Sequence, residues 1–241
     1  MPDADVPDPD VPDPDESLLD NPAWFALTGP QTSLAVRQGA AARFDPAMSP
    51  FVGMADDSDA SWSDLARLLG PGAPAVMFQL GHVPAGWTQT FSGLGLQMIA
   101  PVAGVTDSVD DPGLIALGSD DAAEMFELAE RTMPGPFERR TPEFGGYVGV
   151  RRDGVLVAMA GERLHPPGWT EISAVCTDGA ARGQGLAGRL VRRVASSIAE
   201  RGDRAMLHVA ASNTGAVSLY ERLGFQIRRE VAFAAYLSPT V

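Results

Sequence analysis

The chain has 241 residues, of which 45% are hydrophobic, and its formal net charge at pH 7 is −13. This length suffices for one large or two small domains with a buried core. No apolar run approaches the ~20 residues that span a bilayer, and the acidic N-terminus does not resemble a secretory signal. A single cysteine excludes an internal disulfide framework and gives no metal-ligand spacing, so we expect a cytoplasmic protein without a metal.

Charge is distributed unevenly along the chain. Residues 1–20 carry eight acidic and no basic residues, and the sequence VPDPD occurs twice, at 6–10 and 11–15. Such a segment cannot bury a core, so we expect residues 1–20 to be a disordered acidic tail. Residues 171–241 carry six acidic residues and nine arginines. This positive balance suits an anionic ligand but is too small for a nucleic-acid surface, although arginines that only solvate helix faces would give the same balance.

Residues 21–100 are predicted to form an N-terminal α/β domain of unassigned role. We expect helices over 21–27 and 61–69 and strands near 34–36, 51–54, 75–80 and 94–100. No phosphate-binding loop occurs in this part. His82 follows a predicted strand and is either a base contributed from a second domain or an ordinary loop histidine.

Residues 101–241 are predicted to form a second domain with a mixed sheet. The expected order is strand, helix, three antiparallel strands, helix, strand, helix and strand. Turn signals at Asp153-Gly154 and Pro166-Pro167-Gly168 join the three antiparallel strands as hairpins. The pattern predicts the strands near 114–117, 147–151, 155–162, 171–177, 205–211 and 225–237, and the helices near 119–131, 186–201 and 213–223.

A glycine-containing loop separates the strand near 171–177 from the following helix. Gly183 and Gly185 flank Gln184, and apolar residues recur at helical spacing from Leu186 onward. The first amides of a helix lack intrahelical partners, and glycines let a phosphate approach them closely. The loop is not a P-loop, because the chain contains no lysine, and it lacks the third glycine of a dinucleotide fingerprint. A plain strand-to-helix turn remains the alternative.

Two motifs in the C-terminal half resemble those of one family. The pattern Arg182-x-x-Gly185-x-Ala187 resembles the acyl-CoA pyrophosphate loop of the GNAT N-acetyltransferases. The later run from Asn213 through Tyr220 to Phe225 is similar to the closing helix of that family, and both motifs resemble its FR47-like branch. The resemblance covers roughly the C-terminal half, most clearly residues 169–225. It implies an α/β (α+β mixed sheet) GNAT fold over 101–241 and, by analogy, a smaller degenerate GNAT-like N-terminal half.

By this resemblance, the protein is expected to be an N-acetyltransferase that moves the acetyl group of acetyl-CoA to a primary amine in a ternary complex. The acceptor is expected to be a small-molecule or peptide amine, with no nucleic acid and no membrane involved. The pantetheine arm would pair with backbone groups of Val175 and Thr177 and would also meet Asn213 and Tyr220. The residues expected to hold the donor pyrophosphate are Arg182, Gly183, Gln184, Gly185, Leu186 and Ala187.

The resemblance also assigns catalytic roles. Tyr220 is the expected general acid that protonates the leaving thiolate, or else a packed tyrosine. Glu171 is the first candidate for the base and Glu162 the second, although either could be a plain strand-end residue. Cys176 is more consistent with a packed core residue than with an acyl-enzyme nucleophile.

Two further expectations concern the acceptor and the class of protein. In the resemblance, Phe137 and Glu143 lie where substrate access is shaped, although both also fit ordinary loop residues. The missing clear base leaves open a catalytically silent CoA-binding sensor or interaction module. The acidic tail and N-terminal half could also serve as a scaffold for a partner.

Overall fold

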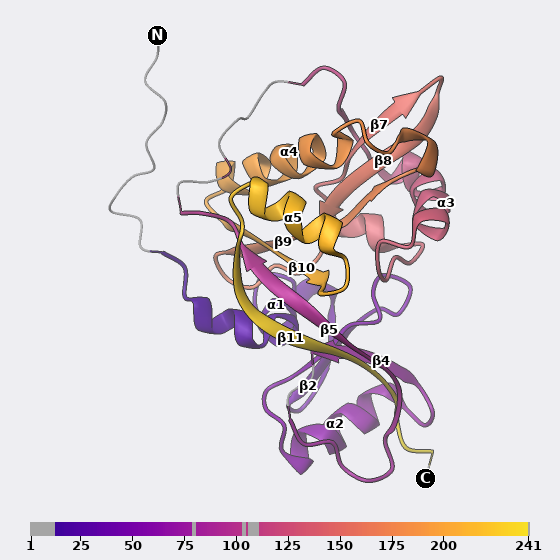
Figure 1. The fold of residues 1–241 in the computed structure, drawn as a ribbon. Helices are drawn as coiled ribbons and strands as arrows, with labels where there is room; N and C mark the ends of the chain where they lie inside the picture. The colour runs from indigo at the N-terminus through magenta and orange to yellow at the C-terminus, as the bar shows by residue number, and fades with distance from the viewer. Residues whose placement is uncertain (1–12, 79–80, 103–104, 106–110, 241) are drawn as a thin grey trace.

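The computed structural model describes residues 13–78, 81–102, 105 and 111–240. An eight-stranded sheet extends through most of the molecule, and a three-stranded sheet lies at one end of it (Figure 1). The strands are β1 (Ala35–Gln38), β2 (Ala41–Phe44), β3 (Val52–Met54), β4 (Pro74–Phe78), β5 (Thr88–Ile99), β6 (Ile115–Ala116), β7 (Val148–Arg152), β8 (Val155–Glu162), β9 (Trp169–Thr177), β10 (Arg204–Ala210) and β11 (Gln226–Leu237).

Helices alternate with these strands in the second half of the chain. The α-helices are α1 (Pro22–Thr28), α2 (Asp59–Leu69), α3 (Ala122–Thr132), α4 (Leu186–Glu200) and α5 (Thr214–Arg222). Short 3-10 helices are η1 (Glu16–Asp20), η2 (Thr32–Leu34), η3 (Ser119–Asp121), η4 (Thr141–Phe144) and η5 (Gly179–Ala181). From β6 to β11 the order of elements is the one that the sequence predicts, so the expected mixed α/β sheet is confirmed.

The large sheet has the strand order β4-β11-β5-β10-β9-β8-β7-β6. Strands β9 and β10 run parallel, and the other neighbours pair antiparallel. Helices α4 and α5 cover one face through a core cluster that includes Leu190, Leu207 and Tyr220. Helices α3 and α1 cover the opposite face through two further clusters. The parallel pair is therefore enclosed on both faces, as parallel strands usually are.

One strand of the large sheet comes from the N-terminal half. Strand β5 lies between β10 and β11 and pairs antiparallel with both. Strand β4 pairs with the outer edge of β11. A boundary at residue 100 thus separates strands that are hydrogen-bonded to one another. The arrangement in two halves stays a prediction, and it has to accommodate this shared sheet.

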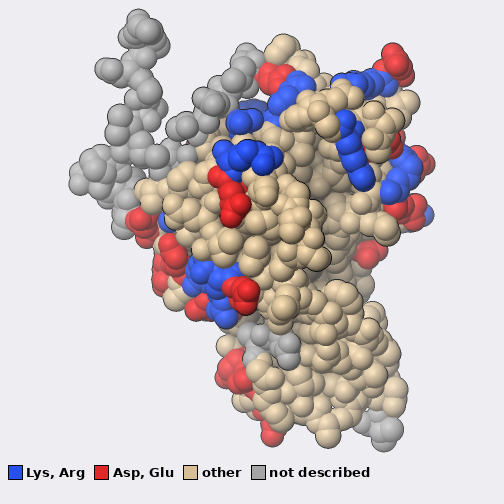
Figure 2. Space-filling view, in the orientation of Figure 1, with Lys and Arg blue, Asp and Glu red and all other residues tan. Residues whose placement is uncertain are grey.

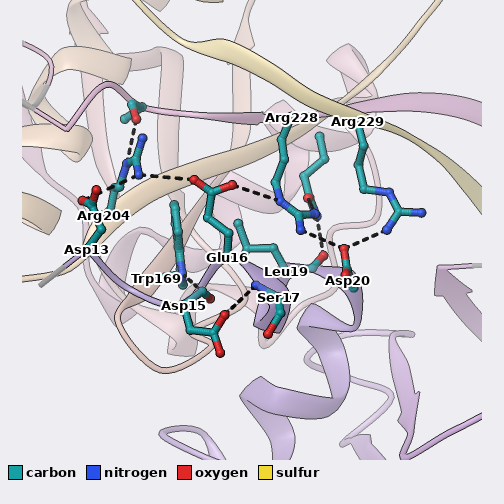
Figure 3. Close-up of polar contacts among 12 residues, drawn as sticks. Asp13, Asp15, Glu16, Ser17, Leu19, Asp20, Trp169, Arg204, Arg228 and Arg229 are labelled. Carbon is teal, nitrogen blue, oxygen red and sulfur yellow. Dashed lines mark hydrogen bonds and ion pairs between the residues drawn. The ribbon is translucent and has the colours of Figure 1, made fainter.

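The first described residues pack on the body of the protein. Leu19 is buried, and the indole Nε1 of Trp169 donates to the backbone oxygen of Asp15 at 3.2 Å. Asp20 pairs with Arg228 and Arg229, at 2.8 Å in each case (Figure 3). Residues 13–20 therefore differ from the predicted disordered tail, because their carboxylates meet arginines that the sequence places about 200 positions later. The remainder of that predicted tail, residues 1–12, lies outside the described residues.

Local differences from the sequence prediction follow from exposure and turn geometry. Strand β5 begins at Thr88, six residues before the predicted start. The sequence does not reveal this first half of the strand, because it is solvent-exposed and lacks an apolar pattern. The hairpin of β1 and β2 turns at Gly39, which has φ +53°. A strand after that turn is absent from the sequence prediction.

We expect a truncated chain of residues 101–241 to lose cooperative folding. The truncation removes β4 and β5, which leaves β10 and β11 without the strand that joins them. Exposed edges of this length promote association instead of folding. Thermal unfolding followed by circular dichroism, with the full chain as control, measures this. A sharp transition in the truncated chain would contradict the expectation.

Candidate active site

The glycine loop opens outward at the N-terminus of α4. Gly183 and Gly185 have φ +75° and +74°, a region in which side chains with a Cβ are strained. A Cβ built on either glycine would meet no atom within 4 Å. Residues 182–185 are exposed. The loop therefore presents its backbone to open space at the positive end of a 15-residue helix.

Arginine side chains surround this loop. The Nε of Arg182 donates to the backbone oxygen of Thr177 at 3.2 Å, and the guanidinium of Arg152 contacts the side-chain oxygen of Gln184. Figure 2 shows basic side chains over the upper part of the molecule, around α4 and the β7–β8 hairpin. Arg189, by contrast, is held by Asp111 at 2.5 Å. The surroundings of the loop suit an anionic ligand.

Strands β9 and β10 separate next to the loop. Their pairing covers four residue pairs and ends at Ile172 and Leu207. Beyond that point β10 continues along β5, and β9 continues along β8. Ala174 has φ +53°, and the register of β8 against β9 shifts there. This β-bulge bends β9 away from β10 and leaves one edge of Ser173–Thr177 unpaired within the described residues.

Alternate side chains of this part of β9 face opposite layers. Val175 packs against the cluster under α4, whereas Ala174 and Cys176 pack against α3. Burial raises the pKa of the Cys176 thiol, which keeps it protonated. This environment agrees with the packed cysteine that the sequence favours.

The closing-helix residues lie beside the separated strands. The side chain of Asn213 accepts from the backbone N–H of Ala216 at 3.2 Å and caps α5. Tyr220 is 7% exposed and packs in the α4–α5 cluster, 6.1 Å from the ring of Phe225. Burial raises the pKa of Tyr220 to about 12, so its hydroxyl carries a proton at neutral pH.

Glu171 is enclosed in a buried hydrogen-bond network. Arg163 donates to both of its carboxylate oxygens, at 2.6 and 2.9 Å, and His208 Nδ1 lies 2.7 Å from Oε1. Burial alone would raise the pKa of Glu171, but Arg163 and the bond from His208 outweigh it and lower the pKa to about 2. A fully buried carboxylate with this pKa and these partners does not suit a general base, which has to take a proton from the substrate.

The second candidate base is also paired. The Glu162 carboxylate lies 2.7 Å from Arg201 and 3.4 Å from His165, and its side chain is 4% exposed. His82 is exposed and lies 3.6 Å from Asp59 of α2. Phe137 is buried against Tyr147, and Glu143 pairs with Arg140. Glu162, His82 and Glu143 are thus each engaged with a charged neighbour, whereas Phe137 packs in the same apolar cluster as Ala174 and Cys176 of β9.

Sequence reasoning missed Arg163, His208 and Gln97. The sequence does hold a signal for Arg163, because the predicted hairpin at Pro166-Pro167-Gly168 brings Arg163 opposite Glu171. In the structure the backbone N–H of Arg163 donates to the Glu171 carbonyl at 3.0 Å. His208 and Gln97 reach this network only through the register of β10 against its neighbours. That register joins residues more than 30 positions apart and leaves no local signal.

Within the described ranges, no group of three or more His, Cys, Asp and Glu side chains is arranged to hold a metal ion. None of the helices in the described part of the chain combines the length and apolar composition that crossing a bilayer requires.

Comparison with known proteins supports one assignment. Residues 147–234 match the family model of FR47-like proteins. A crystal structure from Novosphingobium aromaticivorans, assigned to the GNAT family as an acetyltransferase, is 42% identical and has a TM-score of 0.82; the match covers 90% of this chain and 97% of that one. The fold, the loop and this relative define an acyltransferase. The chain belongs to the GNAT family of acetyltransferases.

Curated relatives match the C-terminal part. The N-alpha-acetyltransferase RimI of Mycobacterium tuberculosis is 34% identical over 108 residues, which are 43% of this chain and 67% of RimI. A mycothiol acetyltransferase of Mycobacterium sp. is 31% identical over 137 residues, and the chain spans 46% of that protein's length. These relatives agree with a GNAT-type acetyltransferase activity.

We expect Glu171→Gln to lower the free energy of unfolding by about 3–5 kcal/mol, because it leaves the buried Arg163 guanidinium without its counter-charge. Urea unfolding at pH 7 measures this. Glu143→Gln is the matched control, since its carboxylate is 48% exposed and the change should cost at most about 0.5 kcal/mol. Equal stabilities of the two variants would contradict the burial argument.

The same ion pair predicts acid sensitivity. The pKa of Glu171 is lower in the folded protein, about 2, than its ordinary value of 4.5. Its contribution is therefore fully present above pH 4.5 and is lost as the pH falls from there toward 2. Unfolding free energies measured between pH 6 and 3 should fall more steeply in the parent than in Glu171→Gln. Parallel pH profiles would show that the carboxylate is not held in its ionised form.

Proposed function

We propose that the protein transfers the acetyl group of acetyl-CoA to a primary amine, by direct attack in a ternary complex. One observation supports this most strongly. The unpaired edge of β9 after Ile172 leads directly to the open glycine loop at the start of α4. An extended thiol-bearing arm and its pyrophosphate require these two features in this order.

The donor would be held mainly by backbone groups. Its pyrophosphate would meet the amides of Arg182 to Ala187, where the two glycines leave open space and the helix end is positive. Its pantetheine arm would pair with the free edge of β9 at Val175 and Thr177, as an added strand does. Asn213 would contact the same arm while it caps α5.

The chemistry would need a polarised carbonyl and a proton for the thiolate. The amine nitrogen attacks the thioester carbon, a backbone N–H near Val175 stabilises the developing oxyanion, and the C–S bond breaks. The leaving thiolate takes the proton of the Tyr220 hydroxyl, which its raised pKa keeps protonated. The proton released by the attacking amine returns to the phenolate through solvent.

Glu171 would act in this scheme as a structural anion. Its oxygens already accept three hydrogen bonds from Arg163 and His208, and the side chain is fully buried. We therefore assign removal of the amine proton to solvent instead of Glu171 or Glu162. Such an enzyme works on the fraction of acceptor that is unprotonated, so its rate should rise with pH up to the pKa of the acceptor.

Both acceptor classes agree with the relatives. RimI is named an N-alpha-acetyltransferase, and the other relative is named a mycothiol acetyltransferase. We propose a peptide N-terminus or a small-molecule amine as acceptor, in a cytoplasmic setting. A screen should include short peptides with free N-termini beside amino sugars and polyamines.

Gly185→Glu should abolish binding of acetyl-CoA. The change puts a carboxylate and its bulk where the pyrophosphate would lie, at a backbone position that already has φ +74°. Gly202→Glu is the matched control, because Gly202 also has a positive φ and open space around it but lies at the other end of α4. Calorimetric titration measures both. Absence of binding by the parent protein would refute the proposed donor site.

Tyr220→Phe should lower kcat by about 100-fold or more while the Kd for acetyl-CoA changes little, because only proton transfer to the thiolate is lost. The measurement is the release of free CoA thiol with any acceptor found in the screen. Phe225→Leu, which alters the ring that packs on Tyr220, is the control for packing. Parent protein that binds acetyl-CoA but turns over no acceptor would favour the silent sensor instead.

A further inference from the structure

One hydrogen bond between side chains spans the point where β9 and β10 separate. Glu171 is opposite Met206 in the paired region, and His208 is the first residue of β10 beyond the last pair, Ile172–Leu207. The imidazole Nδ1 of His208 lies 2.7 Å from Glu171 Oε1. This hydrogen bond joins the two strands across the last pair, on the face of the sheet opposite α4.

The tautomer of His208 follows from the partners of Gln97. The amide nitrogen of Gln97 donates to the backbone oxygen of Leu19 at 2.8 Å, and its oxygen accepts from Arg228 at 2.8 Å. These two bonds fix which end of the amide is nitrogen. That same nitrogen lies 3.0 Å from His208 Nε2, which must therefore be an acceptor. The proton of the ring is then on Nδ1, where it is donated to Glu171.

The ring of His208 has no nitrogen left for a substrate. Its side chain is 1% exposed, and the rings of Phe78 and Phe233 pack on it at centroid distances of 4.4 and 5.8 Å. A Cβ on Gly95 would lie 2.2 Å from the Phe233 ring, so glycine is required there for this packing. His208 is thus held in one orientation and cannot exchange protons with an acceptor directly.

We propose that His208 is a positioning residue for acyl transfer. In the Nδ1–H tautomer that Gln97 imposes, it ties β9 to β10 through Glu171 and fixes where the two strands separate. The free edge of β9 that would receive the pantetheine arm begins two residues after Glu171. The position of this edge relative to β10 therefore depends on the hydrogen bond between His208 and Glu171. The inference rests on the proposed donor site.

Two substitutions of His208 distinguish the effect of its hydrogen bond to Glu171 from the effect of its packing. His208→Asn keeps an amide N–H near the position of Nδ1 and can still donate to Glu171, whereas His208→Gln places its amide near Nε2 and loses that donor. We expect His208→Gln to raise the KM and the Kd for acetyl-CoA by about tenfold with kcat changed less than about threefold. His208→Asn should restore most of the donor affinity. Leu65→Ala in α2, a remote buried position, is the control for lost stability.

The outcomes are distinct. If the parent does not bind acetyl-CoA, the proposed function fails and this inference fails with it. If the parent binds and His208→Gln binds equally well, or if Leu65→Ala weakens binding as much, only this inference is overturned. Nitrogen NMR of the imidazole in the parent protein gives a test that needs no variant of His208. We expect a protonated Nδ1 and an unprotonated Nε2, and the reverse tautomer would refute the proposed hydrogen bond from His208 to Glu171.

Discussion

The separation of two parallel strands is the constraint on which the rest of this structure depends. A sheet gains stability from pairing, so a gap between neighbouring strands has to be imposed from elsewhere. Here Ala174 occupies a left-handed backbone conformation and bends β9 outward, at a cost of order 1–3 kcal/mol. The bend is stabilised on both faces, by Val175 under α4 and by Cys176 against α3.

A buried charge network supports the same region from beneath. Arg163 and Glu171 form a buried bidentate pair, and a buried pair gives little net stability although it is costly to break. Its value lies in geometry, since Arg163 meets Glu171 only through the β8–β9 hairpin and His208 joins them only through the register of β10. The network continues through His208 and Gln97 to Arg228, and from there to carboxylates near the N-terminus.

The N-terminal half contributes to the large sheet instead of standing apart from it. Strand β5 lies between β10 and β11, and residues 13–20 place Asp13, Glu16 and Asp20 near arginines of β10 and β11 (Figure 3). Ion pairs as exposed as these are individually weak, but Leu19 is buried beneath them and adds apolar contact. The region that leads to the unpaired edge of β9 is thus assembled from both ends of the chain.

The sequence by itself determined the features that depend on local chemistry. Residues close together in the sequence predict the glycine loop, the start of α4, the cap of α5 and the order of elements from β6 to β11. The resemblance to the GNAT acetyltransferases also rests on such local motifs. Only the tertiary structure decided that β5 enters the sheet between β10 and β11, that residues 13–20 dock, and that Glu171 is paired with Arg163 and His208. Each of these is a pairing between residues far apart in the chain. Local propensity and hydrophobic period carry no information about such register, which emerges only when the whole sheet packs.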